Sequence, residues 1–155
     1  MSSTHSHIDI PISKFTTMTD KIYSTDTRNK DFTQKCRTTL MAMPSRQNIP
    51  FNRLVDMIIH SEAPGYYVSY EYALRRINEI HKTGKSSVRN SINRLLWNEI
   101  YSKTIDALHS GRFRNIPHAL THVLVTEKAS RFFISHQQAM RLFSSNRSTL
   151  KNSKQ

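Results

Sequence analysis

Apolar residues recur every three or four positions along most of the chain after residue 48, a spacing typical of amphipathic helices. The first such stripe follows Pro50, a residue favoured at helix starts, and comprises Phe51, Leu54, Val55, Ile58 and Ile59. Pro64 and Gly65 should end this helix near residue 61. Ser69 can cap a second helix, which Gly84 should end.

A third helix is predicted to be the longest in the chain. Ser86 or Ser87 can cap its start, and Gly111 closes it. Its inward side would consist of Val88, Ile92, Leu95, Leu96, Ile100, Ile105 and Leu108. These patterns predict an all-α fold of about five to six helices.

The sequence repeats itself at a distance of about 66 residues. Asn48-Ile-Pro50 returns as Asn115-Ile-Pro117, and EAPGYYVSYEYALRRI, from residue 62, returns as KASRFFISHQQAMRLF, from residue 128. The second copy is one residue shorter after the Asn-Ile-Pro motif, so Leu54 corresponds to Leu120, 66 positions later. An aromatic pair, a capping serine and a following alanine at fixed spacing indicate an internal duplication of a helix–elbow–helix unit, residues 49–77 and 116–143. We expect the two copies to flank the long helix within one domain.

Each copy carries an aromatic pair at its elbow, Tyr66-Tyr67 and Phe132-Phe133. Buried aromatic rings contribute strongly to core packing, so burial against the long helix is the simpler interpretation. The alternative is that one ring of each pair is exposed and stacks on nucleic-acid bases. Phenylalanine in the second copy favours the core, because the hydroxyl group is dispensable there.

The remaining segments divide the chain further. Residues 1–30 are polar with isolated apolar positions, and we expect them to be mostly disordered. Residues 31–48 can form a short helix or linker that Pro44 stops. Residues 49–145 make the helical domain, and residues 146–155 a basic, polar C-terminal tail.

The charge of the chain indicates what kind of partner it binds. The 155 residues carry a formal net charge of +12, a balance that favours a polyanionic partner. Residues 111–155 alone hold 8 Lys/Arg against 1 Asp/Glu. No signal peptide or membrane-spanning stretch is evident, and one cysteine cannot form an internal disulfide. These features favour a cytoplasmic protein without a membrane partner, and leave its oligomeric state open.

Catalytic and metal sites find little support. His118 and His122 share one face of a predicted helix, but the further ligands of a zinc site are missing. No nucleophile elbow, phosphate loop or dinucleotide fingerprint is present. Lys35 and Arg37 should lower the pKa of Cys36, yet no oriented base accompanies it. We therefore predict no metal, no cofactor and no enzymatic activity.

The turn from Thr83 to Ser87 and the helix after it resemble the turn and second helix of a helix-turn-helix motif. Small residues form the turn, and Arg and Asn, which read guanine and adenine edges, face outward. The exposed side would consist of Lys82, Lys85, Arg89, Asn90, Asn93 and Arg94. The alternative is an ordinary helix with a solvated basic face.

Four further arginines, Arg112, Arg114, Arg131 and Arg141, can contact phosphates without reading sequence. The leading hypothesis is a non-catalytic nucleic-acid-binding protein in a regulatory or accessory role. Double-stranded DNA is the nucleic acid that we expect it to bind. The rival hypothesis is a protein-interaction or assembly component whose basic face docks an acidic protein surface.

Overall fold

The computed structural model describes residues 25–43 and 48–153, with side-chain surroundings described as far as residue 145. Within these residues the chain forms six helices and no strand, which confirms the predicted all-α fold. The helices are α2 (Thr25–Ala42), α3 (Phe51–Ile59), α4 (Tyr70–Thr83), α5 (Ser91–His109), α6 (Ile116–Thr126) and α7 (His136–Ser153). None of the described helices is long and apolar enough to cross a membrane.

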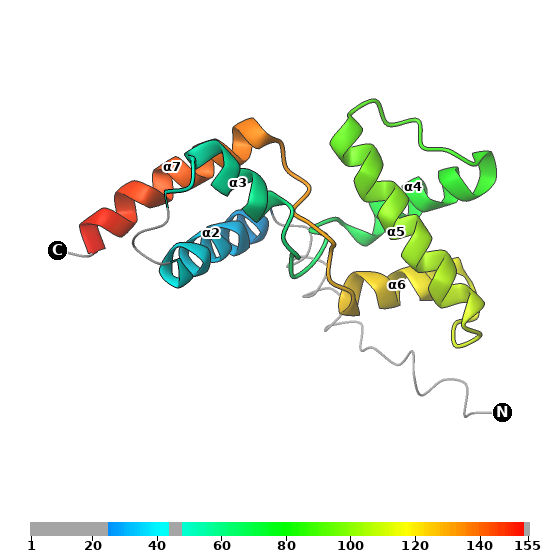
Figure 1. Ribbon diagram of the computed structural model, residues 1–155. Coiled ribbons are helices and arrows are strands. Elements are labelled where there is room, and N and C mark those ends of the chain that lie inside the picture. The colour runs from blue at the N-terminus through cyan, green and yellow to red at the C-terminus, as the bar shows by residue number, and fades with distance from the viewer. Residues whose placement is uncertain (1–24, 44–47, 154–155) are drawn as a thin grey trace. The chain divides into compact units, whose positions relative to one another are not determined.

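The helices form two compact three-helix units. One is the continuous segment Tyr67–Glu127, which holds α4, α5 and α6; the other combines α2 and α3 of Thr25–Tyr66 with α7 after Lys128. Figure 1 shows the same grouping, with α2 and α3 beside the orange-to-red α7, and α4 beside α5 and α6. The range 49–145, expected to be one domain, is thus divided between two units.

The α4–α6 unit has a core of aliphatic side chains around one tryptophan. Its buried residues are Ala73, Ile77 and Ile80 of α4, Leu96, Trp97, Ile100 and Thr104 of α5, and Ala119, Leu120, Val123 and Leu124 of α6. Thr104 is tolerated there because its hydroxyl donates a hydrogen bond to the carbonyl of Ile100 at 2.7 Å. The apolar pattern missed Trp97 and Thr104 and wrongly placed Leu95 inward, since that side chain is 49% exposed.

The ends of α4 lie where the sequence predicts them. The Ser69 hydroxyl accepts a hydrogen bond from the Tyr72 amide, and Gly84 closes the helix with a left-handed φ of 84°. The predicted caps of the next helix, Ser86 and Ser87, are wrong. The long helix α5 begins at Ser91, with Asn90 as its cap.

The α2–α3–α7 unit is built around aromatic contacts. Phe32 of α2 meets Phe132 edge to face, with ring centroids 5.3 Å apart, and Phe51 of α3 meets Phe143 of α7 at 4.6 Å.

Helix α2 begins at Thr25, so residues 25–30 are helical where disorder was expected; the rest of that predicted segment lies outside the described residues. Helix α7 runs on to Ser153, where a polar tail from residue 146 was expected.

Two extended elbows, residues 60–69 and 127–135, precede α4 and α7. In the described structure they meet at an antiparallel bridge in which Ala63 and Ala129 exchange both hydrogen bonds, at 3.0 and 2.9 Å. The first ring of each aromatic pair is buried, Tyr66 at 4% exposure and Phe132 at 1%, whereas Tyr67 and Phe133 are partly exposed. Phe132 packs on α2 rather than on the long helix.

Candidate nucleic-acid interface

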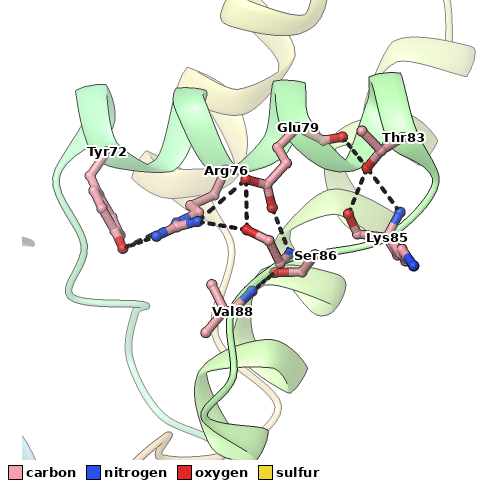
Figure 2. Close-up of polar contacts among 8 residues, drawn as sticks. Tyr72, Arg76, Glu79, Thr83, Lys85, Ser86 and Val88 are labelled. Carbon is pink, nitrogen blue, oxygen red and sulfur yellow. Dashed lines mark hydrogen bonds and ion pairs between the residues drawn. The ribbon is translucent and has the colours of Figure 1, made fainter.

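The connection between α4 and α5, residues 84–90, is here called the basic loop. It has seven residues rather than the three or four of a helix-turn-helix turn, so the resemblance to that motif does not extend to the loop length. Thr83 fixes its first turn, because its hydroxyl contacts the carbonyls of Glu79 and Lys85, each at 2.8 Å. Figure 2 shows these contacts at the end of α4.

Glu79 of α4 holds the middle of the basic loop. Its carboxylate accepts hydrogen bonds from the amide of Ser87 at 2.7 Å and from the hydroxyl of Ser87 at 3.0 Å. The hydrogen bonds from the Ser87 amide and hydroxyl, followed by the charge of Arg76, lower the pKa of Glu79 from its ordinary value. The Ser86 hydroxyl accepts from the Val88 amide at 3.2 Å. With these groups engaged, neither serine is free to cap a helix.

A second layer of contacts extends from Glu79 back along α4. Arg76 donates to the Tyr72 hydroxyl through Nε at 3.1 Å and Nη2 at 2.7 Å, and its Nη1 lies 3.4 Å from Glu79 (Figure 2). The guanidinium groups of Arg75 and Arg76 lie 5.4 and 5.0 Å from the Tyr72 ring centroid. This places a cationic and aromatic surface beside the basic loop.

Sequence reasoning missed this surface. Tyr72 occupies an apolar position of α4 in the sequence, but its side chain is 38% exposed and meets Trp97 edge to face at 5.4 Å. A signal was nonetheless present. Tyr72, Arg76 and Glu79 are spaced by four and three residues, so they share one face of a helix.

The predicted cations around the loop are Lys82, Lys85, Arg89 and Arg94, and all four side chains are exposed. Within the described residues, no carboxylate forms an ion pair with any of them. Arg94 ties α5 to the loop, because its Nη2 donates to the Arg89 carbonyl at 3.1 Å. The structure therefore brings these four cations to one loop and the helix ends beside it.

Asn90 and Asn93 occupy different roles. The Asn90 side-chain oxygen accepts from the Asn93 amide at 3.0 Å and caps α5. Bidentate recognition of adenine needs both the oxygen and the nitrogen of an asparagine side chain, so Asn90 cannot read a base without uncapping the helix. Asn93 has an exposed side chain on the first turn of α5.

Arg112 and Arg114 lie past the other end of α5, in the turn before α6, and both are exposed. The 19 residues of α5 separate this turn from the basic loop by about 28 Å. Arg112 lies over the Phe113 ring at 5.3 Å, and Phe113 contacts His122 at 4.6 Å. Burial, followed by the charge of Arg112, lowers the pKa of His122.

The last two predicted residues belong to the other unit. Arg131 lies over the Phe133 ring at 5.4 Å, and Arg141 is exposed on α7. The ten predicted residues are therefore not one cluster. Six gather around the basic loop, two lie at the far end of α5, and two lie in the α2–α3–α7 unit.

The described residues contain no group of three or more metal-ligating side chains. Cys36, expected to have a pKa lowered by Lys35 and Arg37, is buried in α2, and burial raises its pKa to about 12. That expectation was wrong because the thiol faces the core rather than its charged neighbours in the sequence. A buried, protonated thiol is a poor nucleophile.

No family model, curated protein or solved structure matches this chain.

Proposed function

We propose that this chain is a non-catalytic nucleic-acid-binding protein that docks on double-stranded DNA through the basic loop and the first turn of α5. The observation that carries the proposal is a set of four exposed cations, Lys82, Lys85, Arg89 and Arg94, on a loop whose adjoining carboxylate is already bound. Glu79 is already engaged within the protein by Ser87 and Arg76. The cations remain available to an external anion.

Local geometry favours phosphate as that anion. Arg89 and Arg94 lie beside the start of α5, where unpaired backbone amides and the helix dipole attract negative charge. Arg112 and Arg114, about 28 Å further along α5, would reach phosphates most of a helical turn away on a duplex. Arg89 and Asn93 are the side chains with the position and chemistry to reach base edges.

The predicted internal repeat does not reproduce the contacts that hold the basic loop. The positions 66 residues after Tyr72, Arg76 and Glu79 hold Gln138, Leu142 and Ser145. None of these can reproduce the aromatic–guanidinium–carboxylate layer that holds the basic loop. Only Arg75 has a like counterpart, Arg141. The contacts that hold the basic loop are thus not repeated in the sequence.

The rival function is docking of an acidic protein surface by the same cations. Exposed cations that carry no base-reading chemistry would serve it equally well. Arg89 and Asn93, together on the outer side of the loop and helix start, favour the nucleic acid. Direct binding measurements separate the two.

The test is a fluorescence-anisotropy titration of a random-sequence duplex at several salt concentrations. The variant Lys85→Ala, Arg89→Ala, Arg94→Ala removes three charges from the basic loop and α5. A matched variant, Lys30→Ala, Arg53→Ala, Arg141→Ala, removes three exposed charges from the other unit. We expect the loop variant to bind more weakly, with a slope of log K against log salt reduced by about 0.9 for each lost phosphate contact.

The matched variant should keep most of the affinity and a slope closer to that of the unaltered protein. Equal losses in both variants would show that net charge, rather than this interface, drives binding. Absence of duplex binding at low salt, from protein with a normal helical spectrum, would overturn the proposal and favour the acidic protein partner.

A further inference from the structure

The helices of the two units correspond in pairs at an almost constant distance along the chain. Helices α2 and α5 begin 66 residues apart, α3 and α6 begin 65 apart, and α4 and α7 begin 66 apart. The long helix was expected to lie between two copies of a shorter repeat. The structure makes it the counterpart of α2, so the repeating segment has three helices.

Burial follows the same correspondence. All four buried residues of α3 have buried counterparts 65 positions later in α6: Leu54 and Ala119, Val55 and Leu120, Ile58 and Val123, Ile59 and Leu124. The sequence alignment paired Leu54 with Leu120, 66 positions later, so the spacing in the structure is one residue shorter than predicted. From the elbows onward the distance is 66, with both members buried in each pair: Ala63 and Ala129, Tyr66 and Phe132, Ala73 and Ala139, Ile77 and Phe143.

The third helix of each segment packs in the other unit. Helix α7 completes α2 and α3, and α4 completes α5 and α6. Phe51 of α3 meets Phe143 of α7, with ring centroids 4.6 Å apart, and α4 packs against α5 and α6 in the other unit. The elbows that carry the third helices meet at Ala63 and Ala129, equivalent residues that exchange equivalent hydrogen bonds.

We infer that residues 25–90 and 91–153 are two copies of one three-helix segment that have exchanged their third helices. The surface formed by the first two helices of either copy is a docking surface, and its partner is the third helix of a second copy. Within one chain each copy supplies that helix to the other. This inference is independent of the proposed nucleic-acid function, and its test uses no nucleic acid.

The experiment cuts the folded, full-length protein once. A cleavage sequence for a site-specific protease is inserted between Lys85 and Ser86 in the exposed basic loop, and the uncut variant is first checked for an unchanged helical spectrum. After cleavage, we expect residues 1–85 and 86–155 to co-elute from a sizing column at the position of the uncut chain. They should separate in denaturant and reassociate when the denaturant is removed.

Two substitutions on α3 then identify the surface. Phe51→Ala removes a ring that contacts α7, and should raise the dissociation constant of the cut halves by about tenfold or more. Met57→Ala is the matched control, because Met57 is exposed on the same helix, and should change it less than twofold. Separate elution of the halves in native buffer, whether folded or unfolded, would overturn the inference. So would equal effects of the two substitutions.

Discussion

Glu79 and Ser87 show how a single pair of side chains sets the shape of a loop. The backbone after Gly84 would otherwise be free to continue into a helix capped by Ser86 or Ser87, as the sequence suggests. Two hydrogen bonds from Ser87 to one carboxylate hold it extended until Asn90. The cations of the loop are therefore exposed because of a contact between two residues that lie eight positions apart in the sequence.

Substituting this carboxylate should therefore loosen the loop. With Glu79→Gln, the charge-assisted hydrogen bonds to Ser87 are weakened, and we expect the Ser87 amide to exchange with solvent several-fold faster. Glu71→Gln, which removes an exposed charge from the first turn of the same helix, is the control and should leave that amide unchanged. Hydrogen exchange followed by NMR makes the comparison. Equal rates in both variants would contradict the role given to Glu79.

The same contact should respond to acid. Ser87 holds the pKa of Glu79 below its ordinary value of 4.5, so the folded state binds this proton less readily than the unfolded chain. Its contribution to stability is present above pH 4.5 and is lost as the pH falls through the lower, folded pKa. The Ser87 amide resonance should move with that titration in NMR spectra. A resonance that titrates with a midpoint at or above pH 4.5 would contradict the lowered pKa of Glu79.

Cys36 gives a chemical test of burial. Since burial raises the pKa of its thiol to about 12, only about 10⁻⁴ of it is ionised at pH 8. An aromatic disulfide reagent should react with the folded protein about a thousandfold more slowly than with protein in denaturant. Rapid reaction of the native protein would place the thiol on the surface.

At the scale of elements, the sequence predicts a helix wherever apolar periodicity and a local cap agree. Helices α3, α4 and α6 follow from their stripes and from Ser69, Gly84 and the Asn-Ile-Pro turns. The start of α5 could not be predicted, because a distant carboxylate engages the expected capping serine. Helix α2 was predicted only in part, since Phe32 and Cys36 are its only described buried residues and most of its other residues are polar.

The candidate site was predictable to the same degree. Charge and exposure identified Lys82, Lys85, Arg89 and Arg94, because neither depends on distant partners. Asn90 and Tyr72 were misassigned although their partners are near in sequence. Asn90 accepts from the Asn93 amide three residues on, and the Tyr72 hydroxyl accepts from Arg76 four residues on. Ser86 and Ser87 were competing candidates for the cap of α5, and the ring of Tyr72 fits an apolar pattern.

The elbows give a sharp prediction about adjacent residues. Phe132 is buried against Phe32, so Phe132→Ala should lower the free energy of unfolding by about 3–5 kcal/mol. Phe133 is partly exposed and stacks beside Tyr66 at 6.5 Å, so Phe133→Ala should cost only about 1 kcal/mol. Urea unfolding of both variants measures the difference. The reverse order would assign the core position to Phe133.

At the scale of the whole molecule, the proposed interface does not lie in the part of the chain with the most positive charge. The α4–α6 unit, residues 67–127, has 9 Lys/Arg against 5 Asp/Glu, whereas residues 25–66 and 128–155 together have 12 against 4. The proposed interface lies in the less strongly charged part. Long-range attraction to a polyanion depends on total charge, but the lifetime of a complex depends on direct contacts.

This separation predicts distinct kinetics for the two triple variants. Both remove three positive charges, so both should slow association with duplex DNA to a similar extent at low salt. Only Lys85→Ala, Arg89→Ala, Arg94→Ala should also accelerate dissociation, because it removes contacts of the bound state. Surface plasmon resonance with an immobilised duplex resolves both rates. Faster dissociation of the Lys30, Arg53, Arg141 variant would move the interface to the other unit.

The reciprocal completion of the two units limits how this gene can change. A deletion that removed residues 25–90 would take α2 and α3 from one unit and α4 from the other. Loss of residues 91–153 would likewise leave both units incomplete. In an ordinary tandem array, recombination between repeats can delete one copy and leave a working domain. Here either deletion leaves one copy without a second copy in the same chain, so that copy could complete its units only by pairing with another chain.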